Sequence, residues 1–148
     1  MAKPEAVFEH RTVRHHTAIL LVAAVDRRIL PALRFVSQLP QTDIRAVHVS
    51  IDHDQTTQLA MDWMNLDLTW LPLHIHEHVA STLPASIRDA VQEEASETGS
   101  ITVVVPEFEL RRWWHAFLHR RSARRIAREL QVLHYVTTVI VPFSTPLS

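Results

Sequence analysis

The residues with the clearest potential for chemistry lie in one basic and aromatic segment, residues 103–130. This segment carries seven of the fourteen arginines and two of the four tryptophans, directly behind a run of β-branched residues. A strand that leads into a helix offers unpaired N–H groups and a positive dipole end to phosphate oxygens. Arginine adds planar, forked donors. The segment therefore fits an anion or nucleotide site, and it also fits an amphipathic helix whose arginines are solvated.

Two charged loops are expected to frame this site. Parallel sheets bind ligands beyond the carboxyl ends of their strands, where the strand order reverses. In a five-stranded sheet these are the loops after the first and fourth strands, and a capping or ion-pairing role stays open for Asp26 in the first loop. The predicted ligand-binding residues are Asp26, Arg27, Val49, Pro106, Phe108, Arg111, Arg112, Trp114, His115, His119, Arg120, Arg121 and Ser122.

The aromatic and imidazole side chains of the segment have alternative roles. Adjacent helical residues diverge by about 100°, so Trp113 and Trp114 cannot both face one core. One is expected to anchor the helix, and the other to be exposed, stack on an adenine or fill a partner interface. His115 and His119 have the spacing of a metal pair, but no glutamate lies between them. We interpret them as phosphate donors or packing residues and expect no metal site.

A second group of histidines, His74, His76 and His78, alternates along a predicted strand and would share one face. Zinc could use such a face, but we favour solvated residues on an edge strand. With eleven histidines, pH sensing is a further option, and the sequence singles none of them out. Asp52 and Asp54 are interpreted as a polar turn. Because the chain shows no nucleophile elbow or Walker loop, we expect no enzyme.

Alternating strands and helices are predicted to position these residues. Aliphatic and β-branched runs predict strands at 18–24, 44–51, 68–75, 101–105 and 136–141, and helical spacing of apolar residues predicts helices at 28–39, 55–65, 83–95 and 111–131. This alternation predicts an α/β fold, with a mostly parallel five-stranded sheet and helices on both faces. Pro72 places the third strand at a sheet edge.

Composition bounds the class of protein. With 148 residues and 47% apolar content the chain can bury one core. The net charge of −1 favours a local anion site and no nucleic-acid partner, and the lack of cysteine excludes disulfides. The longest apolar run, 18–25, is far shorter than the roughly 20 residues of a membrane span. Residues 1–16 are expected to form a flexible lead-in or tether, and residues 17–148 one domain.

The segment after the fourth predicted strand resembles a sequence motif of one protein family. Cytoplasmic C-terminal domains of APC-superfamily permeases of the KimA potassium-importer type carry I-P-x-F-x-x-[KR]-[KR]-W-W-H-x-x-L-H-x-x-[ST] there. The matching residues are Val105, Pro106, Phe108, Arg111, Arg112, Trp113, Trp114, His115, Leu118, His119 and Ser122. The family's closing V-x-x-V-P-[YF] strand is matched loosely by 136–143. The likeness begins at about Thr17, and the five-strand pattern resembles the universal stress protein fold, whose sheet order is commonly 3-2-1-4-5.

The resemblance implies a regulatory domain of a potassium or amino-acid transporter. Such a domain lies in the cytoplasm at the inner face of the membrane, beside the membrane-embedded transporter region in cis or trans. KimA-type importers are associated with control by cyclic di-AMP, and universal stress proteins often bind adenine nucleotides. A cyclic dinucleotide is therefore the expected ligand, and no cofactor is expected.

A missing glycine-rich loop refines that expectation. ATP-binding stress proteins use a G-x2-G-x9-G-[ST] loop after the fourth strand, where bare backbone approaches phosphate closely. The single glycine of this chain, Gly99, precedes that strand. Arginine and histidine side chains would have to hold the phosphates instead, which suits two separated phosphodiesters better than a compact triphosphate.

The fifth predicted strand, 136–141, is rich in β-branched residues, and at a sheet edge it would invite pairing with another chain. We therefore expect a homodimer joined through the fifth strands, as in the related domains. Two alternatives to a nucleotide sensor stay open. One is a dimerisation and docking domain whose arginine helix faces the membrane or the transporter, and the other is an ATP- or AMP-binding stress-type protein.

Overall fold

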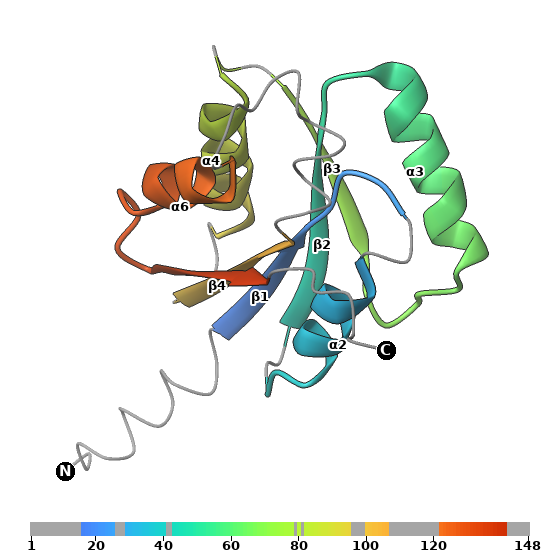
Figure 1. Ribbon diagram of the computed structural model, residues 1–148, viewed down its shortest axis with the longest axis horizontal. Helices are drawn as coiled ribbons and strands as arrows, with labels where there is room; N and C mark the ends of the chain where they lie inside the picture. Colours follow the sequence, from blue (N-terminus) through green and yellow to red (C-terminus); the bar gives the residue numbers. More distant parts are fainter. Residues whose placement is uncertain are drawn as a thin grey trace, which may run out of the picture.

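The computed structural model describes residues 16–25, 29–40, 43–78, 80, 82–95, 100–106 and 122–141, without the side chains of 122 and 123. Within these ranges, strands and helices alternate along the chain (Figure 1). The elements are β1 (His16–Leu21), α2 (Leu30–Ser37), β2 (Asp43–Ser50), α3 (His53–Asn65), β3 (Leu73–Glu77), α4 (Leu83–Glu94), β4 (Ser100–Pro106), α6 (Ser122–Leu130) and β5 (Val136–Val141).

The five strands form one parallel sheet in the order β3-β2-β1-β4-β5, which confirms the predicted order. The central strand β1 pairs on both sides, with Ile19 opposite Arg45 of β2 and Val103 of β4. Residues 17–24 are all buried. A strand covered on both faces needs apolar side chains at every position, which is why this part of the sequence is a continuous aliphatic run.

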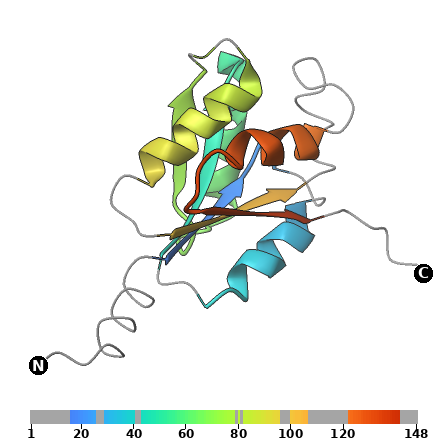
Figure 2. The same ribbon diagram turned by 90° about the vertical axis from the view of Figure 1, so that its left-hand side faces the viewer.

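Helices cover both faces of the sheet, as predicted (Figure 2). On one face α4 and α6 pack through Ile87, Val91 and Ile126 against alternate residues of β1, β2 and β4. On the other face α2 and α3 pack against the remaining residues, through side chains such as Val36 and Trp63. Each fully buried aliphatic side chain contributes about 1.5 to 3 kcal/mol to folding, so these two layers supply the main stabilisation.

The helix starts explain several polar residues of the sequence. The Asp52 carboxylate accepts hydrogen bonds from the backbone N–H groups of Asp54 and Gln55, at 2.9 and 3.4 Å, and so caps α3. The Asp-His-Asp stretch, expected to be a polar turn before a helix at 55, is therefore the cap and first residues of α3. Thr82 caps α4 in the same way, and a proline follows in its first turn.

The third strand lies at the sheet edge, as Pro72 predicts, but its position differs from the expected range of 68–75. Proline has no N–H for the ladder, so the strand begins directly after it, at Leu73, and continues to Glu77. The Pro72 carbonyl still accepts a hydrogen bond from the N–H of Ala46, at 2.8 Å. Residues 68–71 turn back toward the core, where the Trp63 indole N–H donates to the Leu71 carbonyl at 3.0 Å.

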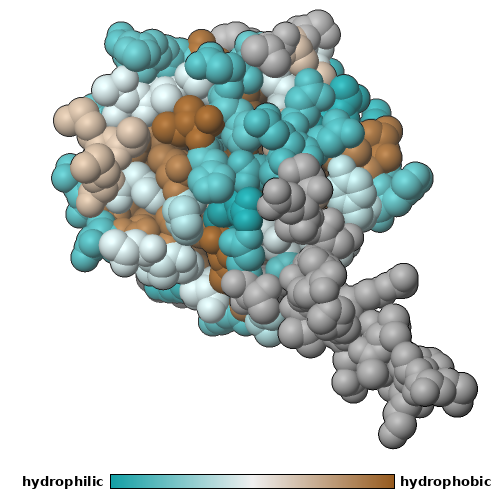
Figure 3. All heavy atoms as spheres, turned by 180° about the vertical axis from the view of Figure 1, so that it is seen from behind, coloured by the Kyte–Doolittle hydropathy of each residue, from teal (hydrophilic) through white to brown (hydrophobic). Residues whose placement is uncertain are grey.

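The described helices include none that is long and apolar enough to cross a membrane. On the rear face of the molecule, apolar side chains lie in separate small patches between hydrophilic ones (Figure 3). Of the predicted helix 111–131, the structure describes the part from Ser122 onward. The predicted lead-in, 1–16, lies outside the described residues except for His16, the first residue of β1.

Candidate functional site

The strand order fixes where a ligand crevice can form. From β1 the chain passes to α2 on one face, and from β4 it passes to α6 on the other face. The helices that follow these neighbouring strands and their loops therefore lie on opposite faces, which is the strand order at which parallel sheets bind ligands. Most predicted site residues fall in these loops and lie outside the described residues. They are Asp26, Arg27, Phe108, Arg111, Arg112, Trp114, His115, His119, Arg120 and Arg121.

The other three predicted residues can be placed. Val49 lies in β2 with a fully buried side chain, inside the core that α4 and α6 cover. Pro106 is the buried last residue of β4, paired with Val141 of β5. Ser122 is the first residue of α6, and its side chain is not described. Their roles in binding stay predictions, but Pro106 and Ser122 bracket the segment that carries most of the predicted phosphate donors.

A buried polar network supports the carboxyl end of β1, and sequence reasoning missed it. His48 of β2 is fully buried, and its Nδ1 lies 2.9 Å from the Val22 carbonyl oxygen. Its Nε2 lies 3.0 Å from the Thr56 hydroxyl of α3, which is 2.7 Å from the Ser50 hydroxyl. The network thus fixes the backbone just before the loop that contains Asp26.

The protonation of His48 follows from its surroundings. Burial lowers the pKa of His48, and the hydrogen bond with the Val22 carbonyl opposes this shift only in part. The ring is therefore neutral near pH 7. Because a carbonyl can only accept, Nδ1 carries the hydrogen and Nε2 accepts from Thr56. A single histidine of β2 thereby ties β1 to α3.

A cavity of about 340 Å³ lies beside this network, under α3. Its lining includes Val25 and the three carboxylates Asp52, Asp54 and Asp62. The like charges of these carboxylates disfavour a phosphate in this cavity. The Gln55 side chain donates to the Ala23 carbonyl at 3.2 Å and helps to close the α3 side.

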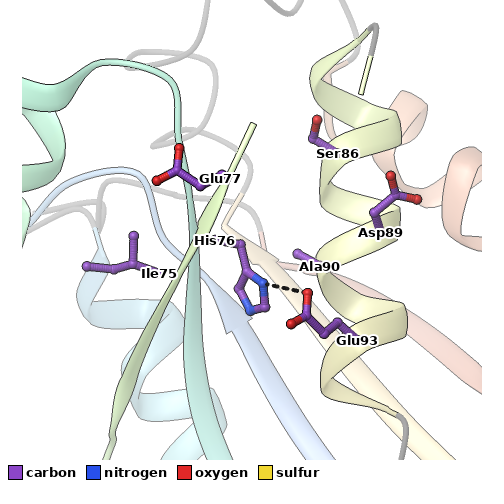
Figure 4. A pocket seen from close by; sticks show the side chains of 7 residues that line it. All are labelled: Ile75, His76, Glu77, Ser86, Asp89, Ala90 and Glu93. Atoms are coloured by element: carbon purple, nitrogen blue, oxygen red, sulfur yellow. Dashed lines mark ion pairs between the residues drawn. The ribbon is translucent and has the colours of Figure 1, made fainter. Parts of the chain in front are cut away.

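A second polar cluster joins β3 to α4. His76 of β3 points toward α4, whereas Ile75 points away from it (Figure 4). The Glu94 carboxylate of α4, with its side chain 6% exposed, lies 2.6 Å from His76 Nε2 and 2.9 Å from His74 Nδ1. Arg45 of β2 donates to the same carboxylate at 2.8 Å. Three side chains from β2 and β3 thus surround one buried carboxylate of α4.

This arrangement corrects the interpretation of the three histidines as solvated. His78 also faces α4, with Nδ1 2.5 Å from the Ser86 hydroxyl, and the His76 side chain is only 13% exposed. The described residues contain no group of three or more histidine and acidic side chains that could hold a metal ion. The alternation of the histidines placed them on one face, but the partner Glu94 is 18 residues beyond His76 and gives no local signal.

The charges of the cluster depend on each other. Burial alone would raise the pKa of Glu94, but hydrogen bonds from His76, Arg45 and His74 outweigh burial and lower it from 4.5 to about 2. The hydrogen bond with Glu94 in turn raises the pKa of His76 against the opposing effect of burial. The cluster therefore holds an ionised carboxylate and favours a protonated imidazole.

Comparison with known proteins relates this fold to a transporter family. The chain is 26% identical over 118 residues to the potassium transporter KimA of Bacillus subtilis (strain 168). The match covers 78% of this chain and 19% of the relative, so the chain spans about a fifth of that protein's length. The family model of the KimA potassium transporter C-terminal domain matches residues 14–143, which include every described element. The chain therefore belongs to the family of KimA potassium transporter C-terminal domains.

Proposed function

We propose that this chain is the regulatory domain of an APC-type transporter of potassium or amino acids and that it binds cyclic di-AMP. In this proposal the domain has a universal-stress-protein-like fold, lies in the cytoplasm against the membrane-embedded transporter region, and catalyses no reaction. Family membership supports the association with a transporter. The proposed ligand rests on the sequence around the fourth strand and on the strand order.

One observation carries the proposed location of the site. The order β3-β2-β1-β4-β5 makes β1 and β4 neighbours, and the helices that follow them, α2 and α6, cover opposite faces. The loop after β1 contains Arg27, and the segment after β4 contains Arg111, Arg112, Arg120 and Arg121. Cationic side chains from two separate loops suit a ligand with two separated phosphodiester charges, and forked guanidinium groups bind such oxygens in pairs.

The same segment argues against a standard ATP loop. Glycine lets the backbone approach a triphosphate closely, and this chain has none after β4. Side-chain donors therefore replace backbone donors in the proposed site. The fully buried Val49 and the neutral His48 belong to its supporting layer, because both are fixed within the sheet or against α3.

We also propose a homodimer through β5. This strand forms one edge of the sheet, and five of its six residues are only half-buried. An edge strand of β-branched residues pairs readily with a second copy. Sedimentation at micromolar concentration is expected to show a dimer, and Thr138→Pro is expected to shift it toward a monomer, since proline removes an N–H from the strand. A monomeric parent chain would refute this part of the proposal.

Calorimetry of the 148-residue chain with cyclic di-AMP, ATP and AMP tests the ligand. Cyclic di-AMP is expected to bind most tightly. Arg112→Ala with Arg120→Ala is expected to weaken binding by about 1.5 to 3 kcal/mol for each arginine that binds a phosphate, which is tenfold or more. The matched control, Arg124→Ala with Arg125→Ala, removes two exposed arginines of α6 and is expected to leave affinity unchanged. Unchanged affinity in the first double variant would refute the assigned site.

A docking domain without nucleotide is a second candidate, and one observation favours it. Arg124, Arg125 and Arg128 of α6 are exposed, and the ion pairs found among the described residues include none of the three. Such a face suits anionic lipid headgroups next to a transporter. Cosedimentation with phosphatidylserine vesicles, weakened at high salt and by the Arg124→Ala and Arg125→Ala variant, together with no nucleotide binding, would favour this candidate.

A further inference from the structure

On the side of the sheet that faces α4, the side chains change from apolar to polar at the edge strand β3. On the inner strands this side carries aliphatic residues, such as Val47 and Val49 of β2, which are fully buried. The residues paired with them on β3 are His74 and His76. The edge strand therefore adds imidazoles where a further strand would normally add aliphatic side chains. Its attachment to α4 has to come from polar contacts, and these depend on protonation in a way that apolar contacts do not.

His74 and His76 of β3, and His78 directly after it, each meet a polar partner on α4. His74 and His76 contact Glu94 at 2.9 and 2.6 Å, and His78 contacts Ser86 at 2.5 Å. Arg45 of β2, which also pairs with Asp43, completes the surroundings of Glu94. We call the contacts of His74, His76 and His78 with α4 the β3–α4 seam. The seam extends over the length of β3. Together with the backbone ladder to β2, it therefore determines the stability of β3 at the sheet edge.

The geometry of His76 requires a proton. Its Nε2 lies 2.6 Å from Glu94, and its Nδ1 lies 3.4 Å from Glu93. Both partners are carboxylates, which only accept hydrogen bonds when they are ionised. A neutral imidazole has a single N–H, so it could satisfy one carboxylate and would turn a lone pair toward the other. The imidazolium form donates to both, and it matches the charge of the cluster.

Solvent protons have a route to this ring. A cavity of about 320 Å³ opens between β3 and α4, and its lining is Ile75, His76, Glu77, Ser86, Asp89, Ala90 and Glu93. Figure 4 shows His76 between the strand and the helix at this cavity. The charged and titratable groups around His76 are Glu93, Glu94 and Asp89 from α4, Arg45 from β2, His74 from β3 and His78 directly after β3, whereas Glu77 points to the other side of the strand (Figure 4). Within this set, folding raises the pKa of His76, mainly because its ring donates a hydrogen bond to Glu94.

We propose that the β3–α4 seam is a proton-operated latch, which holds the edge strand β3 against α4 while His76 is protonated and loosens it when His76 loses its proton. Glu94 raises the pKa of His76 above its ordinary value of 6.5. The stabilisation is therefore complete below about pH 6.5 and is lost as the pH rises through the higher pKa of the folded state. The backbone ladder between β2 and β3 still forms but opens more often, so the change is local to the edge.

Hydrogen exchange of the 148-residue chain tests this latch. Protection factors of the β3 amides, corrected for the intrinsic pH dependence of exchange, are expected to fall as the pH rises above about 6.5 and through the raised pKa of His76, whereas those of β1 stay constant. The fall is about tenfold for each pH unit by which folding raises the pKa of His76. Nuclear magnetic resonance of the His76 ring in the same samples reports whether its titration and the loss of protection share one midpoint.

Three variants separate the latch from a merely structural role. His76→Gln cannot be charged, so β3 protection is expected to be low and independent of pH. His76→Arg carries a permanent charge and is expected to keep β3 protected over the pH range in which the parent chain loses protection. His53→Gln changes an exposed histidine of α3 and is expected to behave like the parent chain. The proposal is overturned if β3 and β1 of the parent chain respond equally to pH, or if His76→Gln retains the parent's pH dependence.

Discussion

Replacement of Glu94 by glutamine offers a quantitative test of the site geometry. The substitution keeps the shape of the side chain and removes the charge that Arg45, His74 and His76 surround. Folding lowers the pKa of Glu94 from 4.5 to about 2. At about 1.4 kcal/mol for each unit, this shift corresponds to about 3 kcal/mol of stability. Because Arg45 keeps its contact with Asp43, we expect Glu94→Gln to lower the free energy of unfolding by about 2 to 3 kcal/mol.

Urea unfolding at several pH values is the appropriate assay. The pKa of Glu94 is lowered in the folded state, so its stabilisation is present above about pH 4.5 and is lost as the pH falls toward 2. The difference between the parent and Glu94→Gln should therefore be largest near about pH 6 and shrink by about pH 3. Glu93→Gln is the matched control, since its side chain is 77% exposed and should change stability by less than about 0.5 kcal/mol.

Two outcomes would refute this reasoning about Glu94. One is a Glu94→Gln variant that unfolds within about 0.5 kcal/mol of the parent near about pH 6, which would mean that burial of the charge cancels its hydrogen bonds. The other is an equal loss of stability in Glu93→Gln, which would mean that the net charge of α4 matters and the buried cluster does not.

Two further predictions concern the polar contacts of α3. Thr56→Val keeps the shape of the side chain but leaves Nε2 of the buried His48 without its hydroxyl partner, so it should lower the free energy of unfolding by about 1 to 3 kcal/mol in thermal or urea unfolding. No change in stability would contradict the hydrogen bond between His48 and Thr56. Asp52→Ala removes the cap of α3 and should lower it by about 0.5 to 2 kcal/mol, whereas Asp52→Asn should retain most of the stability, and equal losses of stability in both would contradict a capping role.

The fold was largely predictable because both faces of the sheet are covered. Strands such as β1 and β4 had to be continuous aliphatic runs, and those runs mark them in the sequence. The bounds of β3 were not predictable in the same way. Its residues are partly exposed and include polar side chains, and the apolar residues that precede Pro72 form a turn toward the core.

The polar contacts of the site were predictable only in part. The capping role of Asp52 is local and can be inferred from the residues that follow it. The hydrogen-bond partners of His48 and His76 cannot be inferred from neighbouring residues. Those of His48 come from the packing of β2 against β1 and α3, and that of His76 comes from the packing of β3 against α4. A buried histidine in an aliphatic strand, as in 46–49, is the single signal that hinted at such a network. Phosphate binding by the arginines that follow β4 in the sequence stays a prediction.

The two margins of the sheet have opposite chemical characters. Along β3, imidazoles and carboxylates lie beside the open ladder, so an approaching strand would have to strip water from charged groups. Along β5, the β-branched residues impose no such penalty. A sheet in which one edge strand disfavours pairing can add a further strand only at its other edge. If the β5 edges of two copies pair about a twofold axis, neither copy has a second edge that pairs readily. Assembly then stops at the dimer, and open-ended fibres are excluded.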